Sequence, residues 1–107
     1  MKVSFLTPVY NIGSGDKKIW FDQSIRSILA QDYQSSIDLF LLNDGSNDDT
    51  RDVLEYYRST YSTINRVFHI VNLPRIGITA ALNKGLEQIS SGVVFRLDAD
   101  DFCRCLS

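Results

Sequence analysis

The sequence has little of what would tie it to nucleic acid or to a membrane. A formal net charge of −2 gives no basic surface, which argues against nucleic acid as a partner. No apolar run approaches the length that spans a bilayer, and the N-terminus lacks the charged-then-apolar pattern of a signal peptide. We therefore expect a cytoplasmic protein without a transmembrane segment, with peripheral attachment to a membrane left open.

Soft metal ligands are scarce as well. The two cysteines, Cys103 and Cys105, lie near the C-terminus, and no other cysteine or suitably spaced histidine completes a zinc ligand set. The one histidine, His69, falls in a strand-like run without cysteine or carboxylate neighbours in register, which favours a structural role. The sequence thus offers neither a zinc site nor an obvious histidine base.

What the chain does contain is a regular alternation of strand-like and helix-like segments. Its 107 residues suffice for one compact domain, and a hydrophobic fraction of 44% is that of a globular protein rather than a disordered one. Apolar runs predict strands, and apolar residues spaced by three and four predict helices. The strands are expected at 2–7, 37–42, 66–71 and 92–97, and the helices at 20–31, from 46 to about 61, and at 78–89. This order predicts an α/β fold, a doubly wound and mainly parallel sheet with helices on both faces.

Local signals set the expected boundaries. Pro8 is expected to end the first strand, and residues 11–16 form a glycine-bearing loop after it. Ser46 begins a capping box with Asp49, which predicts the start of the second helix. Gly92 is expected to end the third helix.

The most informative cluster is acidic. Asp98, Asp100 and Asp101 directly follow the apolar run Val93-Val94-Phe95. Carboxylates this close repel one another, and oxygen ligands at a strand end suit a hard cation, Mg²⁺ or Mn²⁺, with positions left for phosphate oxygens. Arg96, in an apparently buried strand, is expected to pair with this cluster.

Two other strand ends carry side chains suited to a nucleoside. In open α/β sheets ligands bind at the carboxyl ends of the strands. Tyr10 follows the first strand and could lie against a base, and Asp44 follows the second and could accept a base N–H or a ribose hydroxyl. Taken singly, Asp44-Gly45 and Tyr10-Asn11 could equally be turns. A Walker phosphate loop is absent, and Lys18 interrupts a possible GxGxxG.

Five motifs in register resemble the family-2 glycosyltransferases of the GT-A fold. They are Thr7-Pro-Val-Tyr-Asn11, Ser27-Ile-Leu-Ala-Gln31, Asn43-Asp-Gly-Ser46 with Thr50, the segment 77–85, and Asp98-Ala-Asp-Asp101. The resemblance covers residues from about 3 to 102. It implies transfer from a nucleotide sugar, usually with inversion, onto a polysaccharide, another glycoconjugate or a lipid-linked acceptor.

The resemblance also implies roles for individual residues. Pro8 and Tyr10 match the segment that contacts the base, and Asp44 matches the acid that reads the uracil edge. Asp98 and Asp100 match the DxD signature for the ribose and the diphosphate-bound metal, and Asp101 could share the metal. A UDP-sugar is favoured, while GDP and dTDP stay open. Asn43, where the family commonly has an acid, and Leu82, where many members carry arginine, are departures.

The family also sets an expectation about completeness. Its members continue past the DxD strand, where the acceptor pocket and the catalytic base lie. We therefore expect residues 1–107 to be the nucleotide-sugar-binding half, truncated after the fourth strand, with no catalytic base and little or no transferase activity alone. The alternative is a non-catalytic remnant that binds nucleotide or folds poorly. An uncovered sheet edge could support self-association. A receiver-like domain would need a lysine at a late strand end, and a nucleotidyltransferase a basic glycine-rich loop; both are missing.

Overall fold

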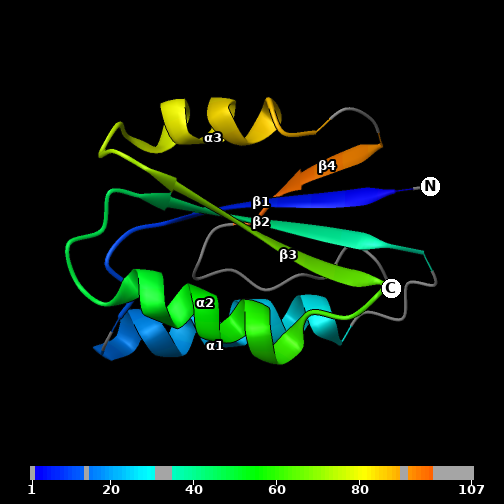
Figure 1. The fold of residues 1–107 in the computed structure, drawn as a ribbon, viewed down its shortest axis with the longest axis horizontal. Coiled ribbons are helices and arrows are strands. Elements are labelled where there is room, and N and C mark those ends of the chain that lie inside the picture. The colour runs from blue at the N-terminus through cyan, green and yellow to red at the C-terminus, as the bar shows by residue number, and fades with distance from the viewer. Residues whose placement is uncertain (1, 14, 31–34, 90–91, 98–107) are drawn as a thin grey trace.

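The computed structural model describes residues 2–13, 15–30, 35–89 and 92–97. Within these ranges the chain forms one four-stranded sheet, in the order β3-β2-β1-β4, with every neighbouring pair parallel (Figure 1). Along the chain the elements are β1 (Val3–Val9), α1 (Gly15–Leu29), β2 (Ile37–Asp44), α2 (Thr50–Tyr61), β3 (Arg66–Leu73), α3 (Ile78–Leu86) and β4 (Val93–Arg96). The predicted alternation and the parallel sheet are confirmed.

Helices cover both faces of the sheet. Figure 1 shows α1 and α2 side by side on one face and α3 on the other. Such a sheet needs apolar side chains in both directions along its strands. Every residue of β2 is buried, and in β1 only Pro8 is partly exposed. The near-continuous apolar runs of these two strands therefore reflect their central position.

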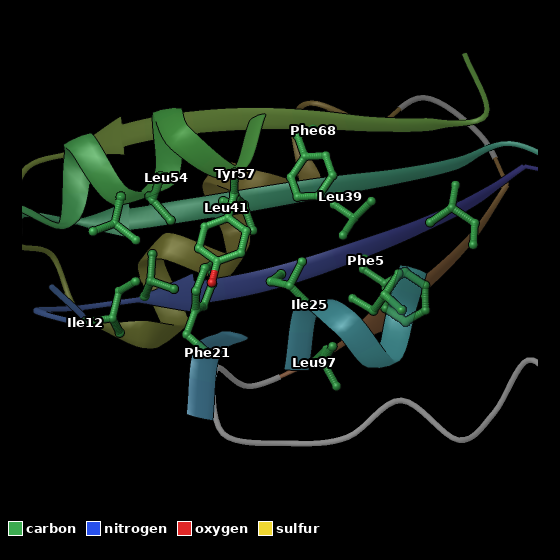
Figure 2. Close-up of a cluster of buried hydrophobic side chains, with 14 of the residues drawn as sticks. Phe5, Ile12, Phe21, Ile25, Leu39, Leu41, Leu54, Tyr57, Phe68 and Leu97 are labelled. Atoms are coloured by element: carbon green, nitrogen blue, oxygen red, sulfur yellow. The ribbon is translucent and has the colours of Figure 1, made fainter. Parts of the chain in front are cut away.

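The larger part of the core lies between the sheet and the α1–α2 layer (Figure 2). Figure 2 shows Phe5 and Leu41 of the sheet facing Phe21 and Ile25 of α1. A smaller cluster of Leu6, Phe40 and Leu42 lies beneath α3. There a Cβ on Gly85 would stand 2.9 Å from the side chains of Leu6 and Leu42, so this glycine lets α3 approach the sheet closely.

One charged group is buried near the amino ends of the strands. Asp38 of β2 is 6% exposed and lies 2.8 Å from Nζ of Lys2 and 3.5 Å from Nε2 of His69. The His69 ring stacks on Phe40 with centroids 4.5 Å apart. A buried carboxylate needs such partners. The expectation that His69 has no carboxylate neighbour was wrong, because Asp38 lies on the adjacent strand.

The predicted end of the first strand was wrong. β1 continues through Pro8 to Val9, and Pro8 pairs with Leu42 of β2. The β1–β4 ladder reaches only Leu6, and Leu97 donates its N–H to the Leu6 carbonyl at 3.0 Å. Even-numbered β1 residues direct their backbone groups to the β4 side, so the missing N–H of Pro8 falls beyond that ladder and costs no bond with β4.

Helix boundaries also differ from prediction. α1 begins at Gly15, five residues early, and α3 ends at Leu86, well before Gly92. α2 begins at Thr50, and its N-cap residue Asp49 makes no side-chain capping bond. The predicted capping box was therefore wrong, because Ser46 Oγ instead accepts a bond from the Asn11 N–H.

The fourth strand is less buried than predicted. Val94 is 36% exposed and Arg96 is exposed, whereas Val93 and Phe95 are partly buried. Of the described side chains near β4, Phe95 stacks on Phe5 at 5.5 Å, on the α1 side of the sheet. In the part of the chain that the structure describes, no helix is long and apolar enough to cross a membrane.

Candidate functional site

The polar residues gather where the strands end. Because all strands run the same way, their carboxyl ends share one edge of the sheet. Tyr10 directly follows β1, Asp44 ends β2, and the β3–α3 loop of residues 74–77 follows β3. This carboxyl edge is the left side of the sheet in Figure 1.

Asp44 is the organising group of this edge. Asp44 is 1% exposed. Its carboxylate accepts hydrogen bonds from the backbone N–H of Ile76 at 2.8 Å and of Gly77 at 3.1 Å. Nη1 of Arg75 lies 2.5 Å from Oδ2 and completes a charge-assisted pair. A carboxylate offers about four lone-pair positions, so most of the hydrogen-bonding capacity of Asp44 is used by the β3–α3 loop.

Arg75 connects Asp44 to the ring at the end of β1. The guanidinium carbon of Arg75 lies 3.7 Å from the centroid of the Tyr10 ring, within cation–π range. The Arg75 side chain is 54% exposed and Tyr10 is half-buried. At this edge a guanidinium therefore contacts both an aromatic ring and a carboxylate, and the arrangement is partly open to solvent.

Gly45 allows the loop to come this close. Its φ of +65° lies in the left-handed region, and a Cβ there would stand 2.5 Å from the backbone nitrogen of Arg75. A side chain would therefore collide with the loop that carries Arg75. The glycine after Asp44 is a packing requirement, and not only a turn signal.

The loops after β1 and β2 are joined by hydrogen bonds. The N–H groups of Asn11 and Ile12 donate to Ser46 Oγ at 3.0 Å and to Thr50 Oγ1 at 2.8 Å. Asp48 accepts from the Gly13 N–H at 3.1 Å and from the backbone and hydroxyl of Thr50. Partial burial acts to raise the pKa of Asp48, but these hydrogen bonds outweigh it and bring the pKa below its ordinary value.

Asn43 supports the same region through its side-chain amide. Nδ2 donates to Oδ1 of Asn72 at 3.0 Å, and Oδ1 accepts from the Ser46 N–H at 3.4 Å. Two acids facing each other here would repel, whereas two amides can bond. The asparagine at this position thus joins the ends of β2 and β3.

The predicted site residues divide into two groups. Pro8, Tyr10 and Asp44 lie at or next to the carboxyl edge, with Tyr10 and Asp44 linked through Arg75. Asp98, Asp100 and Asp101 form the acidic cluster that was expected to pair with Arg96, and they lie outside the described residues. Leu97, the last described residue, is at the carboxyl end of β4 beside β1. Within the described ranges, no group of three or more metal-ligating side chains occurs.

Arg75 is the residue that sequence reasoning missed. The predicted site residues all follow strands one, two and four, and none was predicted in the loop after the third strand. A signal was present, because Pro74-Arg75-Ile-Gly77 directly follows an apolar strand whose end must share the same edge. The Lys84 side chain of α3 is 57% exposed, and its Nζ lies 3.8 Å from a carboxylate oxygen of Glu87.

This arrangement suits a flat, partly charged ligand. A planar base can lie against an aromatic ring or a guanidinium, and a diphosphate requires cationic charge nearby. Arg75 is a cation at this edge, and a divalent ion is what the residues after β4 were predicted to hold.

Solved structures of other proteins share this fold. The model superposes on the mannosyltransferase PcManGT from Pyrobaculum calidifontis, in complex with GDP-Man and Mn²⁺, with a TM-score of 0.79 and 22% identity over 94% of this chain. It also superposes on S. aureus TarS residues 1–349 in complex with UDP, with a TM-score of 0.71 and 24% identity over 95% of this chain. In each case this chain covers 28% of the other chain. The fold is therefore that of the N-terminal part of a GT-A structure.

Sequence comparison identifies the family. The glycosyltransferase TuaG of Bacillus subtilis (strain 168), named for teichuronic acid biosynthesis, is 32% identical over 100 residues, which are 92% of this chain and 36% of TuaG. This chain spans between 13% and 36% of the length of eight curated relatives that it matches. The family model described as "Glycosyl transferase family 2" matches residues 4–104. The chain belongs to glycosyltransferase family 2.

Proposed function

We propose that residues 1–107 form the nucleotide-sugar-binding part of a glycosyltransferase that acts in polysaccharide or other glycoconjugate synthesis. The observation that carries this proposal is the Tyr10–Arg75–Asp44 arrangement at the carboxyl edge. It combines an aromatic face, a cation and a buried carboxylate where α/β sheets bind nucleotides. The complexes of TarS with UDP and of PcManGT with GDP-Man and Mn²⁺ support the same class of donor.

In this proposal Pro8 and Tyr10 contact the base, and Asp44 acts mainly by positioning Arg75. The carboxylate of Asp44 is already bound by three donors, so a base N–H can reach it directly only at a remaining lone pair or after Arg75 moves. UDP is the favoured nucleotide of the donor, because the remaining lone pair of Asp44 can accept the uracil N–H.

The remaining assignments concern residues 98–101. Asp98 is proposed to contact the ribose, and Asp98, Asp100 and Asp101 to hold Mg²⁺ or Mn²⁺ at the diphosphate. A divalent ion there would offset the negative charge that grows on the leaving phosphate oxygens. In the reaction an acceptor hydroxyl, on a saccharide or a lipid-linked molecule, attacks the anomeric carbon as the nucleoside diphosphate leaves.

The attacking hydroxyl also needs a base within hydrogen-bond reach. At the described part of the edge, Asp44 and Asp48 already accept bonds from the surrounding loops. We assign no catalytic residue to this chain. Binding of the donor is therefore the function proposed for residues 1–107.

A calorimetric titration with UDP tests the proposal. Wild-type chain, in the presence of Mn²⁺, is expected to bind UDP, and Asp100→Ala is expected to lose the dependence of binding on Mn²⁺. Asp16→Ala, at an exposed carboxylate in the first turn of α1, serves as the control for loss of one acidic charge.

Two results would count against the proposal. A folded chain that binds no UDP, GDP or dTDP with either metal would favour a remnant without donor binding. Binding that is equally strong in Asp100→Ala, with and without Mn²⁺, would remove the metal assignment.

A further inference from the structure

A second polar and aromatic region lies away from the carboxyl edge, on the outer side of the α1–α2 layer. A cavity of about 430 Å³ opens there between the two helices, lined by Lys18, Asp52, Val53, Tyr56 and Tyr57. Its volume is within the roughly 300–1,000 Å³ typical of small-ligand sites. None of the residues assigned to the donor lies in it.

The floor of this cavity is a rigid aromatic interior. Val53 is 9% and Tyr57 5% exposed, and the Tyr57 ring packs edge-on against Phe21 of α1 with centroids 5.2 Å apart. Figure 2 shows Tyr57 extending from α2 toward Phe21. The Tyr57 hydroxyl donates to Oδ1 of Asp22, whose Oδ2 lies 2.7 Å from Nε of Arg26. The floor is therefore fixed before any ligand arrives.

The walls of the cavity are open to ligand. Tyr56 is 59% exposed, and its ring centroid lies 5.7 Å from that of Tyr57. Lys18 and Asp52 are exposed, and among the described residues neither makes an ion pair or a side-chain hydrogen bond. Both lie in the first turn of their helices. The site thus offers a ring, an ammonium donor and a carboxylate acceptor.

Beyond the cavity, charged side chains continue along α1. Lys18, Asp22 and Arg26 follow one another at intervals of four residues, so they share one face of α1 and span about 12 Å. Arg26 lies 5.9 Å from the centroid of Tyr61, which is one turn beyond Tyr57 on α2. We call the cavity, together with the adjoining surface that reaches Arg26 and Tyr61, the α1–α2 groove.

The charges of the groove select a neutral ligand. An anion would meet Asp22 and Asp52 as well as the two cations, and a cation would meet Lys18 and Arg26. A saccharide chain has what the groove complements. Each sugar ring has an apolar C–H face for a tyrosine ring and a rim of hydroxyls that both donate and accept hydrogen bonds.

We propose that the α1–α2 groove binds a neutral saccharide chain, as a subsite separate from the donor edge. The groove begins where α1 and α2 do, next to the loops that are joined by the Gly13–Asp48 and Ile12–Thr50 bonds. A chain bound there would lead toward the carboxyl edge. The choice of saccharide rests in part on the proposed function, whereas the site itself rests on the groove.

The test is an NMR titration of the ¹⁵N-labelled 107-residue chain with chitotetraose, cellotetraose and maltotetraose. At least one is expected to cause saturable shifts at the amides of Lys18, Asp22, Asp52 and Tyr56. Tyr56→Ala is expected to weaken the Kd about tenfold, because an aromatic contact contributes up to roughly 1.5 kcal/mol. Tyr56→Phe, the matched control, retains the ring and is expected to stay close to wild type.

The outcomes separate this inference from the proposed function. No saturable shift in the groove with any of the three tetrasaccharides would overturn it, as would shifts confined to Tyr10, Asp44 and Arg75. Equal affinities of Tyr56→Ala and wild type would also overturn it, since Tyr56 is exposed and its truncation leaves the core intact. UDP is titrated in parallel. Loss of UDP binding with saccharide binding retained would leave the groove standing and reject only the donor site.

Discussion

At the scale of single residues, Asp44 carries most of the candidate site. It is almost fully buried at the end of β2, and its three partners all come from the loop after β3. Two of the partners are backbone N–H groups, which no substitution at their own positions can remove short of proline. The side chain at position 44 therefore controls the conformation of a loop about thirty residues further along the chain.

Asp44→Asn is expected to lower the free energy of unfolding by about 1–3 kcal/mol, because an amide loses the charge and turns one donor toward the N–H groups of Ile76 and Gly77. Arg75→Gln should cost at most about 1 kcal/mol, since the Arg75 side chain is half-exposed. Urea denaturation of both variants measures the difference. Equal losses would mean that the ion pair, rather than the buried backbone bonds, accounts for the stability.

Sequence reasoning at this scale found Tyr10 and Asp44 but not what joins them. Their positions after apolar strands were enough to predict that both lie at the carboxyl edge. The link through Arg75 could not be predicted, because it depends on how closely the β3–α3 loop approaches Gly45 in three dimensions. The roles of Asp98, Asp100 and Asp101 stay predictions, since these residues lie outside the described ranges.

At the scale of elements, the loops at the carboxyl edge depend on glycines of two different kinds. Gly15 and Gly45 both have φ in the left-handed region, at +68° and +65°. A Cβ on Gly15 would meet nothing within 4 Å, whereas one on Gly45 would collide with the backbone of Arg75. The pair therefore separates the cost of backbone conformation from the cost of contact.

Gly15→Ala is expected to cost only the left-handed penalty of about 1–2 kcal/mol. Gly45→Ala should cost about 1–3 kcal/mol more, because it also forces the β3–α3 loop away. Urea denaturation gives the two costs, and the side-chain NMR signal of Arg75 reports the loop. If both variants lose the same stability and the Arg75 signal does not move, the close approach at Gly45 has no energetic importance.

The elements themselves were easier to predict than their ends. Apolar runs and three-four spacing identified all the strands and helices that the structure describes. The boundaries were missed where distant bonds decide them. Ser46 does not cap α2, because its hydroxyl accepts the Asn11 N–H, and Ile12 likewise bonds to Thr50 at the start of α2. Such bonds join residues more than thirty positions apart, which no local pattern records.

At the scale of the whole molecule, ionisable groups limit the stability of the fold at low pH and at high pH. Burial acts to raise the pKa of Asp22, but hydrogen bonds from Tyr57 and Arg26 lower it overall, and the pKa of Asp48 is lowered in the same way. Burial, together with the bond to Asp22, raises the pKa of the Tyr57 hydroxyl. The ionised carboxylates and the neutral phenol are therefore the forms that the fold stabilises.

The free energy of unfolding is accordingly expected to be highest at intermediate pH and to fall at both acidic and alkaline pH. A lowered aspartate pKa contributes stability that is present above the ordinary value of about 3.9 and is lost as the pH falls through the folded pKa. The raised Tyr57 pKa contributes stability that is present below the ordinary value of about 10 and is lost as the pH rises beyond it. Urea midpoints between about pH 2 and pH 11 test both limbs.

Two variants test which residue contributes to the loss of stability at acidic pH and which to the loss at alkaline pH. Asp48→Asn is expected to flatten part of the acid limb, and Tyr57→Phe part of the alkaline limb, each relative to wild type at neutral pH. An unchanged acid slope in Asp48→Asn would show that the bonds to Gly13 and Thr50 do not distinguish its ionised form.

The central position of β1 gives the molecule a direction of assembly. β1 precedes the other described strands in the chain, and it has neighbours on both sides, β2 through Val3 and Ile37, and β4 through Val3 and Val93. One side of β1 can be closed early in synthesis, by β2 and then β3. The other side has to wait for nearly the whole described chain. Until then, β1 has one open edge, and β4 is the strand that covers it.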